Sequence, residues 1–397
     1  MSTMLIGHPL FWIFAVAVLA PLLAEIPTPL KVPVVVLEVV LGIVIGPHVL
    51  DLAHFDGFLE TMFDFGMAAT LFVGGMELDF ADIKGRPLLL AVGGWTLSVL
   101  LSVAIVSLLR GIAHVHTPLI VAMALCTTGL GVVAPGFRDS GLLGTAFGRL
   151  VLAAGTLGEV GPIIAMSLLL SQQYSIWQEG AFLLIFLVVI VAALAIGVGA
   201  RPPKALEILG RHMNKSTQLP VRISVLVLAG LLLLAQTFGF ENFTGAFAAG
   251  MILGAATRSE RGSPLREKME ALSFGWFYPF FFVGAGIQFD LGALRHDLST
   301  MLLVPVFAIL FLVIRGAPIL LYRGSVDASQ LLPLALSSAV PSLTIVVVIT
   351  QTGARVGSIT PDVAAAMIGA AMLSILVFPT IAGSLLSRAQ RAVEQES

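Results

Sequence analysis

Glu159 is the residue whose type and position most directly imply chemistry. It lies in the middle of the apolar run 147–171, in the segment Gly155-Thr-Leu-Gly-Glu-Val-Gly-Pro162. An ionised carboxylate at membrane depth is costly, so such residues usually face a protein interior and have a function. A carboxylate there can hold a proton or a metal cation but not both well, which is a sufficient chemical basis for exchanging them. The alternative is a permanently protonated Glu159 that donates a structural hydrogen bond.

Arg315 is the one basic residue in the middle of an apolar run, within Val-Ile-Arg-Gly-Ala-Pro of 299–322. A guanidinium keeps its proton, so this side chain must be paired or solvated. Its possible partners are Glu159, the carbonyl ends of interrupted helices, or an acid such as Asp64 or Glu60. We expect a structural and electrostatic role for Arg315 rather than proton transfer, and we expect Asp64 at the mouth of a cavity.

Two further apolar runs contain residues that interrupt helices. These are Thr127, Thr128, Gly129 and Gly131 in 118–136, and Ser337, Ser338, Pro341, Ser342 and Thr344 in 328–351. Glycine and proline cost a helix about 1 and 3 kcal/mol relative to alanine. Unwound backbone is tolerated at membrane depth only where it is buried in protein or lines a watery cavity.

Two such breaks, placed across one another, would offer carbonyls and helix ends to a cation. The alternative is Ser/Thr hydrogen bonding within each helix together with a simple proline kink. The predicted ligands of a cation or proton, beside Glu159, are Thr127, Thr128, Ser337 and Ser338. The residues expected to shape this site are Gly158, Pro341 and Ser342.

The composition requires these groups to be held by membrane helices. The 397 residues are 58% hydrophobic and 11% charged, with a mean hydropathy of +1.02, whereas a soluble domain has roughly a quarter of its residues charged. The net charge of −2 gives no footprint for nucleic acid. The single Cys126 excludes an intramolecular disulfide. Because the first ten residues contain no Lys or Arg, we expect a retained helix rather than a cleaved signal peptide.

Apolar runs near the length of about 20 residues that spans a bilayer predict an all-α polytopic membrane protein with about thirteen helices. The predicted spans are 9–25, 32–46, 57–78, 88–109, 118–136, 147–171, 180–200, 219–238, 242–256, 270–289, 299–322, 328–351 and 361–387.

Basic residues orient these spans. With the N-terminus outside, cytoplasmic segments contain seventeen Lys and Arg, and external loops contain three, Arg110, Arg295 and Arg355. This bias follows the positive-inside rule. It predicts an odd number of spans in the plasma (inner) membrane, with the N-terminus outside and the C-terminus cytoplasmic.

The two halves of the chain echo each other. The segments 42–46, 72–79 and 124–128 recur, at lags of 208 to 211 residues, as 250–254, 282–290 and 335–339. Seven spans separate the matched helices (2 and 9, 3 and 10, 5 and 12), so the predicted six-helix repeats are inverted. Inverted repeats are typical of secondary transporters, whose substrate site lies at the midplane. The alternative is a duplication without a transport role.

Three segments resemble conserved helices of the monovalent cation/proton antiporter superfamily, in particular its bacterial sodium/proton and potassium-efflux branch. They are Leu37-Glu-Val-Val-Leu-Gly-Ile-Val-Ile-Gly-Pro47, Phe63-Asp-Phe-Gly-Met-Ala-Ala-Thr-Leu-Phe-Val-Gly-Gly-Met-Glu-Leu-Asp79 and Pro279-Phe-Phe-Phe-Val-Gly-Ala-Gly-Ile-Gln-Phe-Asp290. The resemblance covers about 10 to 388. The order of the motifs and the helix count make it specific.

The resemblance implies one exchanger domain that forms a homodimer and exchanges Na⁺, K⁺ or Li⁺ for H⁺ by an elevator-like motion. The dimerisation part would be about 9–78 and 219–289, the transport part about 88–171 and 299–388, and the linker helix about 180–200. Crossed helices 5 and 12 would match the two interrupted runs. The ion-binding acid of helix 6 would match Glu159, and the basic residue of helix 11 would match Arg315.

This chain departs from the family pattern at Gly158, where many members carry a second acid or an asparagine. The missing acid makes 1:1 electroneutral exchange the simpler expectation. Glutamate in place of aspartate leaves the ion preference open. The chain ends about ten residues after the last predicted span and has no Gly-rich nucleotide-binding motif, so we expect such regulation to be absent or supplied separately.

Three other functions are alternatives. A solute/sodium symporter of a related inverted-repeat fold should have fewer spans and more polar core residues. A non-transporting membrane sensor would not need Glu159, Arg315 and both breaks. An intramembrane enzyme would need a catalytic group, and the spans contain no His-Glu-x-x-His run, Ser/His pair or paired Asp. No cofactor is implied; the expected partners are the cation, the proton, membrane lipid and a second copy of the chain.

Overall fold

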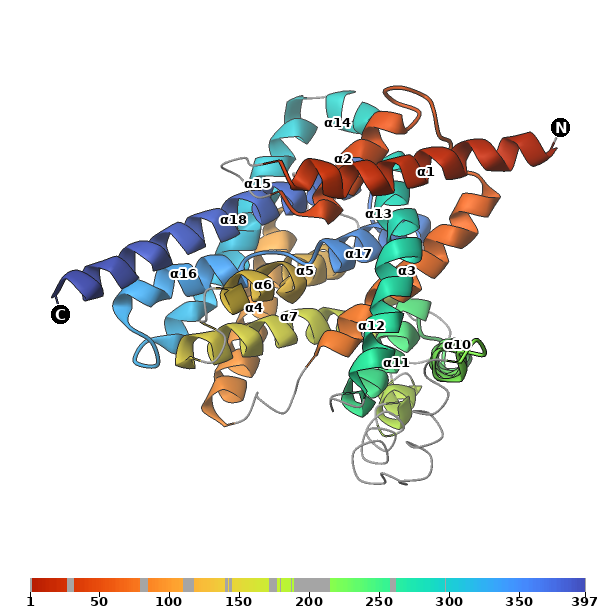
Figure 1. Cartoon of the computed structure of the whole chain (residues 1–397). Helices are drawn as coiled ribbons and strands as arrows, with labels where there is room; N and C mark the ends of the chain where they lie inside the picture. Colours follow the sequence, from red (N-terminus) through yellow and green to blue (C-terminus); the bar gives the residue numbers. More distant parts are fainter. Residues whose placement is uncertain are drawn as a thin grey trace. The chain divides into compact units, whose positions relative to one another are not determined.

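The computed structural model describes most of the chain as helices joined by turns (Figure 1). It describes residues 2–26, 32–78, 85–109, 118–139, 142, 145–170, 177–178, 180–186, 188, 215–257, 262–296 and 298–396. Within these ranges, the β structure is a single isolated bridge between Arg323 and Val326. The prediction of an all-α fold is confirmed.

Contacts divide the chain into two compact units. Unit 1 comprises Met1–Ile6, Phe55–Asp79 and Ser167–Gly284. Its helices are α3 (Gly57–Glu77), α10 (Leu219–Thr237), α11 (Asn242–Ala256), α12 (Ser263–Leu272), the π-helix η1 (Ser273–Phe277) and most of α13 (Tyr278–Ile287). The run from α12 to α13 begins seven residues before the predicted tenth span. Of the predicted linker helix, the structure describes residues 180–186 and 188.

Unit 2 comprises Gly7–His54, Phe80–Met166 and Ala285–Ser397. Its helices are most of α1 (Ser2–Ala24), α2 (Val34–Ile45), α4 (Arg86–Leu109), α5 (Pro118–Leu125), α6 (Leu130–Asp139), most of α7 (Ala146–Leu170), α14 (Leu291–His296), α15 (Leu298–Gly316), the 3₁₀-helix η2 (Ala317–Tyr322), α16 (Ala328–Ser338), α17 (Leu343–Arg355) and α18 (Pro361–Glu396). This grouping places α1 and α2 with α4–α7. The predicted division into dimerisation and transport parts therefore stays a prediction.

In unit 1, α3 and α11 meet through glycines. A Cβ atom added to Gly250 would overlap the carbonyl oxygen of Phe72, and one added to Gly254 would lie 2.8 Å from the Cα of Met76. Small residues of this kind let the backbones of two membrane helices approach closely. The α3–α11 seam is therefore a contact between two unbroken helices.

In unit 2, α2 meets the end of α13 in the same way. A Cβ on Gly286 would lie 2.8 Å from the Cα of Gly42, and a Cβ on Gly46 would lie 3.2 Å from the Cα of Ile287. Glycines in two of the three matched pairs of the predicted repeat thus form close helix contacts. The repeat itself stays a prediction.

Six described helical segments are long and apolar enough to cross a membrane, and four shorter apolar helices accompany them. The six are Arg86–Leu108, Ala146–Leu169, Leu219–Thr237, Leu298–Tyr322, Ala328–Arg355 and Pro361–Leu386, and the four are Pro9–Ala24, Val34–Ile45, Pro118–Ala134 and Asn242–Ala256. The count of thirteen spans stays a prediction.

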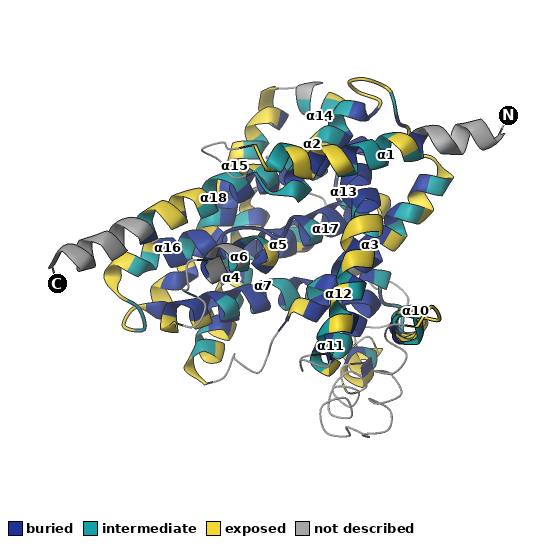
Figure 2. Ribbon diagram, viewed as in Figure 1, coloured by how far each residue is buried: buried dark blue, intermediate teal, exposed yellow. Residues whose placement is uncertain are grey.

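The helix α15 illustrates how such a segment is used (Figure 2). Its exposed apolar side chains, Leu302, Val306, Ile309 and Val313, follow one stripe. Phe307, Phe311 and Arg315 lie on the buried side. A helix that is apolar on its exposed face as well as its buried face is suited to lipid. The buried face positions Arg315 inside unit 2.

Candidate functional site

The two predicted helix breaks are present in unit 2. The helix α5 ends at Leu125 and α6 begins at Leu130, while α16 ends at Ser338 and α17 begins at Leu343. The residues between them, 126–129 and 339–342, are buried. Glycine and proline disfavour helix at these positions, and Ser and Thr side chains offer the backbone other hydrogen bonds. The prediction of interrupted helices is confirmed.

The two breaks are bonded to each other. The backbone N–H of Gly129 donates to the carbonyl oxygen of Val340 at 2.8 Å, and the Thr128 hydroxyl donates to the carbonyl oxygen of Ser338 at 2.6 Å. A Cβ atom on residue 129 would lie 2.7 Å from the carbonyl oxygen of Pro341. Glycine is therefore required at 129 for the breaks to lie this close.

The helix α7 places Glu159 against the first break. The N–H of Thr128 donates to the Gly158 carbonyl oxygen at 3.0 Å, and the N–H of Leu130 donates to Glu159 Oε1 at 3.0 Å. Leu130 is the first residue of α6, where backbone N–H groups lack helical partners and the helix dipole favours negative charge. The carboxylate is half-buried, so it combines a fixed donor with some access from outside.

Arg315 is buried beside the same break, and its donors reach three neutral oxygens. The Nε atom donates to Thr128 Oγ1 at 2.9 Å, Nη1 to Ser98 Oγ at 3.3 Å and Nη2 to the Ala154 carbonyl oxygen at 2.9 Å. The planar guanidinium presents its N–H groups in a fixed fork, so these bonds fix its orientation. The Thr128 hydroxyl accepts from Arg315 and donates to the Ser338 carbonyl oxygen, so it connects the first break to α15 and to the end of α16.

Gly158 lies so close to Thr128 and Arg315 that there is no room for a side chain at this position. A Cβ atom there would lie 2.5 Å from Thr128 Oγ1 and 2.8 Å from Arg315 Nη2. The Thr128–Arg315 pair thus occupies the space that a side chain at residue 158 would need. In this chain the position of the second family acid is filled by a hydroxyl and a guanidinium.

Other predicted site residues fall outside this cluster of contacts. The Thr127 hydroxyl donates to the Ala124 carbonyl oxygen at 2.9 Å, and the Ser337 hydroxyl donates to the Pro333 carbonyl oxygen at 2.8 Å, both within their own chain segments. Asp64 lies in α3, which belongs to unit 1. The ligand roles of Thr127 and Ser337, and the cavity-mouth role of Asp64, stay predictions.

The remaining predicted residues belong to the second break. Ser338 is buried at the end of α16, and its Oγ atom has no hydrogen-bond partner among the described residues. Pro341 lies against Gly129. Ser342 immediately precedes α17, without a hydrogen bond from its side chain to the first turn. A buried hydroxyl without a partner is unfavourable unless something satisfies it, which makes Ser338 the most distinctive polar group of this break.

Two partners of Arg315 are not predicted by the sequence. Ser98 is a fully buried hydroxyl on α4, and a serine in the middle of the apolar run 88–109 was a usable signal for it. The Ala154 carbonyl is a backbone group that leaves no trace in residue type. Among the described residues, no three His, Cys, Asp or Glu side chains gather as a metal-binding group.

Comparison with known proteins gives consistent matches. The chain is 23% identical over 390 residues to the putative Na⁺/H⁺ antiporter YjbQ of Bacillus subtilis (strain 168), covering 93% of this chain and 61% of that protein. It is 28% identical over 319 residues to cation/H⁺ antiporter 19 of Arabidopsis thaliana, covering 74% and 39%. The chain therefore spans about three fifths and two fifths of these relatives.

A solved structure shows the same fold. The structure of the sodium proton antiporter MjNhaP1 from Methanocaldococcus jannaschii aligns with a TM-score of 0.65 and 18% identity, covering 96% of this chain and 98% of that one. The model of the family described as sodium/hydrogen exchanger, transmembrane, matches residues 14–388. This chain therefore belongs to the transmembrane sodium/hydrogen exchanger family.

Proposed function

We propose that the chain is a secondary antiporter that exchanges a monovalent cation, Na⁺ or K⁺, for H⁺, with Glu159 binding either one in competition. The observation that carries this proposal is the Glu159 carboxylate, which accepts the Leu130 N–H at the start of α6, beside two helix breaks that are hydrogen-bonded to each other. The names of the relatives as Na⁺/H⁺ or cation/H⁺ antiporters support the same activity.

The competition has a simple physical basis. A cation needs the carboxylate ionised and several oxygen ligands around it, whereas protonation removes the charge that attracts it. The predicted oxygen ligands are the hydroxyls of Thr127, Thr128, Ser337 and Ser338. Of these, the Ser338 hydroxyl is buried without a hydrogen-bond partner among the described residues. A bound cation would give its oxygen the partner that a buried polar group needs.

Arg315 would limit the charge that the site can hold. Its guanidinium stays protonated, and it shares Thr128 with the break beside Glu159. A fixed positive charge near the site repels a second cation. Together with Gly158, which supplies no second acid, this favours exchange of one proton for one cation without net charge movement.

Alternating access would follow the elevator-like motion of a transport part past a dimerisation part, in a homodimer in the inner membrane. The seventeen-to-three bias of basic residues supports an outside N-terminus and a cytoplasmic C-terminus. The close glycine seams within each unit support the idea that helices inside one part move together.

Reconstitution into liposomes tests the exchange directly. A proton gradient is imposed, Na⁺, K⁺ and Li⁺ are added in turn, and internal pH is followed for the wild type, Glu159→Gln and the control Glu60→Gln, an exposed acid of α3. We expect cation-dependent proton movement in the wild type and the control, and its loss in Glu159→Gln. Silence of the folded wild type with all three cations would contradict antiport and favour a symporter or a sensor.

Charge balance is tested in the same liposomes. Clamping the membrane potential at different values with an ionophore should leave the exchange rate unchanged if one proton exchanges for one monovalent cation. A rate that rises with the potential would show net charge movement and contradict the 1:1 expectation.

A further inference from the structure

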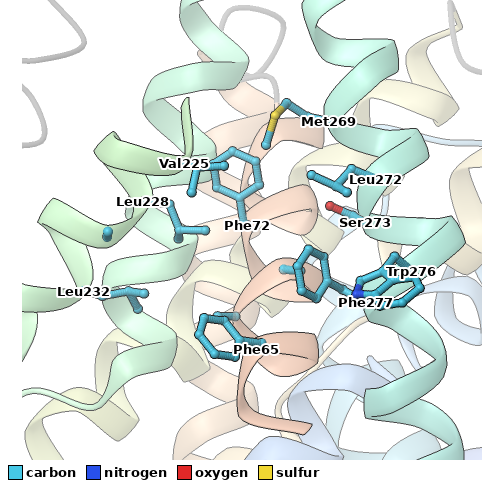
Figure 3. Close-up of a pocket in the computed structure, with 13 residues that line it drawn as sticks. Phe65, Phe72, Val225, Leu228, Leu232, Met269, Leu272, Ser273, Trp276 and Phe277 are labelled. Carbon is cyan, nitrogen blue, oxygen red and sulfur yellow. The ribbon is translucent and has the colours of Figure 1, made fainter. Parts of the chain in front are cut away.

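Unit 1 contains an apolar cavity of about 350 Å³ that is separate from the Glu159 cluster (Figure 3). Its walls are α3, α10 and the turn from α12 into η1. The lining residues are Phe65, Ala68, Ala69, Phe72, Val225, Leu228, Ala229, Leu232, Met269, Leu272, Ser273, Trp276 and Phe277. Apart from Ser273 and the indole nitrogen of Trp276, this lining is hydrocarbon, so the cavity suits an apolar guest.

Local structure explains why the space exists. Three lining residues come from the π-helix, Ser273, Trp276 and Phe277, and π-turns inside helices are frequently found at functional sites. Alanines at 68 and 229 leave room that larger side chains would fill. Phe65 and Trp276 are 53% and 48% exposed, so the cavity reaches the surface of the unit.

One end of the cavity is basic. Figure 3 shows Val225 and Met269 toward one end and Phe65 and Leu232 toward the other. Arg222, an exposed side chain, precedes Val225 by three residues and so lies on the same face of α10. Lys268 precedes Leu272 by four residues on α12, and its Nζ atom donates to Gln218 Oε1 at 3.0 Å, which links the start of α10 to the middle of α12.

The acids near this end are mostly engaged or directed elsewhere. Glu267 accepts from Ser263 at 2.8 Å, and Glu270 pairs with Arg266 at 2.9 Å, both within α12. Glu77, at the end of α3, is five residues from Phe72, which places it about 140° around the helix from that lining residue. Against the carboxylates of Glu77, Glu267 and Glu270 stand four basic side chains, Lys215, Arg222, Arg266 and Lys268, so this end of the cavity keeps a net positive charge.

We propose that this cavity binds an acyl chain of an anionic phospholipid, whose headgroup phosphate is held by Lys215, Arg222 and Lys268. An apolar slot for the chain and a basic rim for the phosphate are the two features that such a lipid requires. The rim belongs to segments predicted as cytoplasmic, where anionic lipids are enriched. This inference shares that orientation with the proposed function but does not depend on exchange, so the two fail separately.

Native mass spectrometry of the full chain tests the proposal. The protein is purified in a mild detergent, stripped of lipid and mixed with equal amounts of dioleoyl phosphatidylglycerol and dioleoyl phosphatidylcholine, which share their acyl chains. We expect phosphatidylglycerol to be retained at least about fivefold more often, since each basic side chain near a membrane surface favours anionic lipid by about that factor. Equal retention of the two lipids would overturn the proposal.

Matched variants locate the site. Ala229→Phe places a phenyl ring in the cavity. Leu226→Phe places the same ring elsewhere on α10, at a position that is 70% exposed and does not line the cavity. Arg222→Gln removes a rim charge, and Arg323→Gln removes an exposed charge from unit 2. We expect Ala229→Phe to lose the retained lipid and Arg222→Gln to lower the preference for phosphatidylglycerol about fivefold, with both controls unchanged.

Two results would contradict this assignment. Equal lipid retention in Ala229→Phe and Leu226→Phe would exclude the cavity as the lipid site. If Ala229→Phe lost the dimer signal but kept the lipid, the cavity would be assigned to a second copy of the chain. If Ala229→Phe does not fold, a chain whose single tryptophan is Trp276 tests the proposal. In mixed vesicles, phosphatidylglycerol with brominated acyl chains should quench the fluorescence of Trp276 more than brominated phosphatidylcholine does. Equal quenching by the two lipids would overturn the proposal.

Discussion

The α3–α11 seam in unit 1 and the two bonded helix breaks in unit 2 both depend on glycine, but in opposite ways. At the seam, Gly75 and Gly250 remove side chains so that two intact helices touch, and their backbone groups stay bonded within each helix. At the breaks, Gly129 gives its N–H to the other segment, at Val340. The first arrangement fixes two helices together. The second places buried polar backbone beside Glu159, where we propose that an ion is bound.

The seam should be the less tolerant region, and adjacent glycines of α3 test this. A Cβ on Gly75 would meet backbone atoms of Phe247 and of Met251, the latter at 2.9 Å, whereas Gly74 has open space. We expect Gly75→Ala to destabilise the protein by about 3 kcal/mol, because backbone cannot move aside. Gly74→Ala should be neutral or slightly stabilising, since alanine favours helix. Thermal unfolding followed by size-exclusion chromatography measures both, and equal melting temperatures would contradict the seam.

Gly158 tests whether a closely packed glycine at the polar site tolerates a methyl group. In Gly158→Ala the new methyl must displace Thr128 or Arg315, at a cost of about 2 kcal/mol. We expect exchange in liposomes to fall about tenfold or more, which corresponds to about 1.4 kcal/mol. The control is Gly93→Ala on α4, where space is open. Unchanged exchange in Gly158→Ala would show that the Thr128–Arg315 contact is dispensable.

The two threonines of the first break differ in where their hydroxyls bond. The Thr128 hydroxyl bonds to other segments, whereas the Thr127 hydroxyl bonds within its own segment. Thr128→Val removes the hydroxyl that joins Arg315 to the Ser338 carbonyl, and it leaves buried groups unsatisfied at a cost of about 1–2 kcal/mol. Thr127→Val removes only a bond to Ala124, so it should cost about 0.5–1 kcal/mol. Unfolding and exchange measured on both variants should show the larger loss at Thr128. The reverse order would contradict the bridging role.

The smallest stability effect is expected at the two serines that end α16. Ser338→Ala removes a hydroxyl without a partner in the described structure. The free energy of unfolding should therefore change by less than about 0.5 kcal/mol, and the melting temperature should shift little. Ser337→Ala removes a bond to Pro333 and should behave similarly. They should differ in the cation concentration that gives half-maximal exchange, which is expected to rise for Ser338→Ala alone. Equal values in both variants would remove Ser338 from the ligands.

The interrupted helices were predictable because they rest on residue type. Glycine, proline and hydroxyl residues in the middle of an apolar run mark unwound backbone, and the observed breaks at 126–129 and 339–342 fall within the predicted runs. Glu159 and Arg315 were visible for the same reason, as charges that apolar surroundings must accommodate. The partners expected for Arg315 were Glu159, the carbonyl ends of the interrupted helices, or Asp64 or Glu60. Its hydrogen bonds go instead to the hydroxyls of Thr128 and Ser98 and to the Ala154 carbonyl on α7.

The hydrogen-bond choices could not be predicted. Sequence does not distinguish the Thr128 hydroxyl, which crosses to another segment, from the Thr127 hydroxyl, which stays within its own. Helix ends also differ from predicted spans. The helices α12 and α18 continue through charged residues, beginning at Ser263 and ending at Glu396, because hydropathy reports the part at membrane depth and not the length of the helix.

Competition between a cation and a proton at Glu159 should appear as proton release when the cation binds. Purified protein in weakly buffered detergent solution, starting at a pH low enough for the cation-free carboxylate to be protonated, is titrated with Na⁺, K⁺ or Li⁺ while the pH is recorded, for the wild type, Glu159→Gln and the control Glu60→Gln. The account predicts release of about one proton per bound cation in the wild type and the control, and none in Glu159→Gln. Cation binding without proton release, or undiminished release in Glu159→Gln, would contradict competition at this carboxylate.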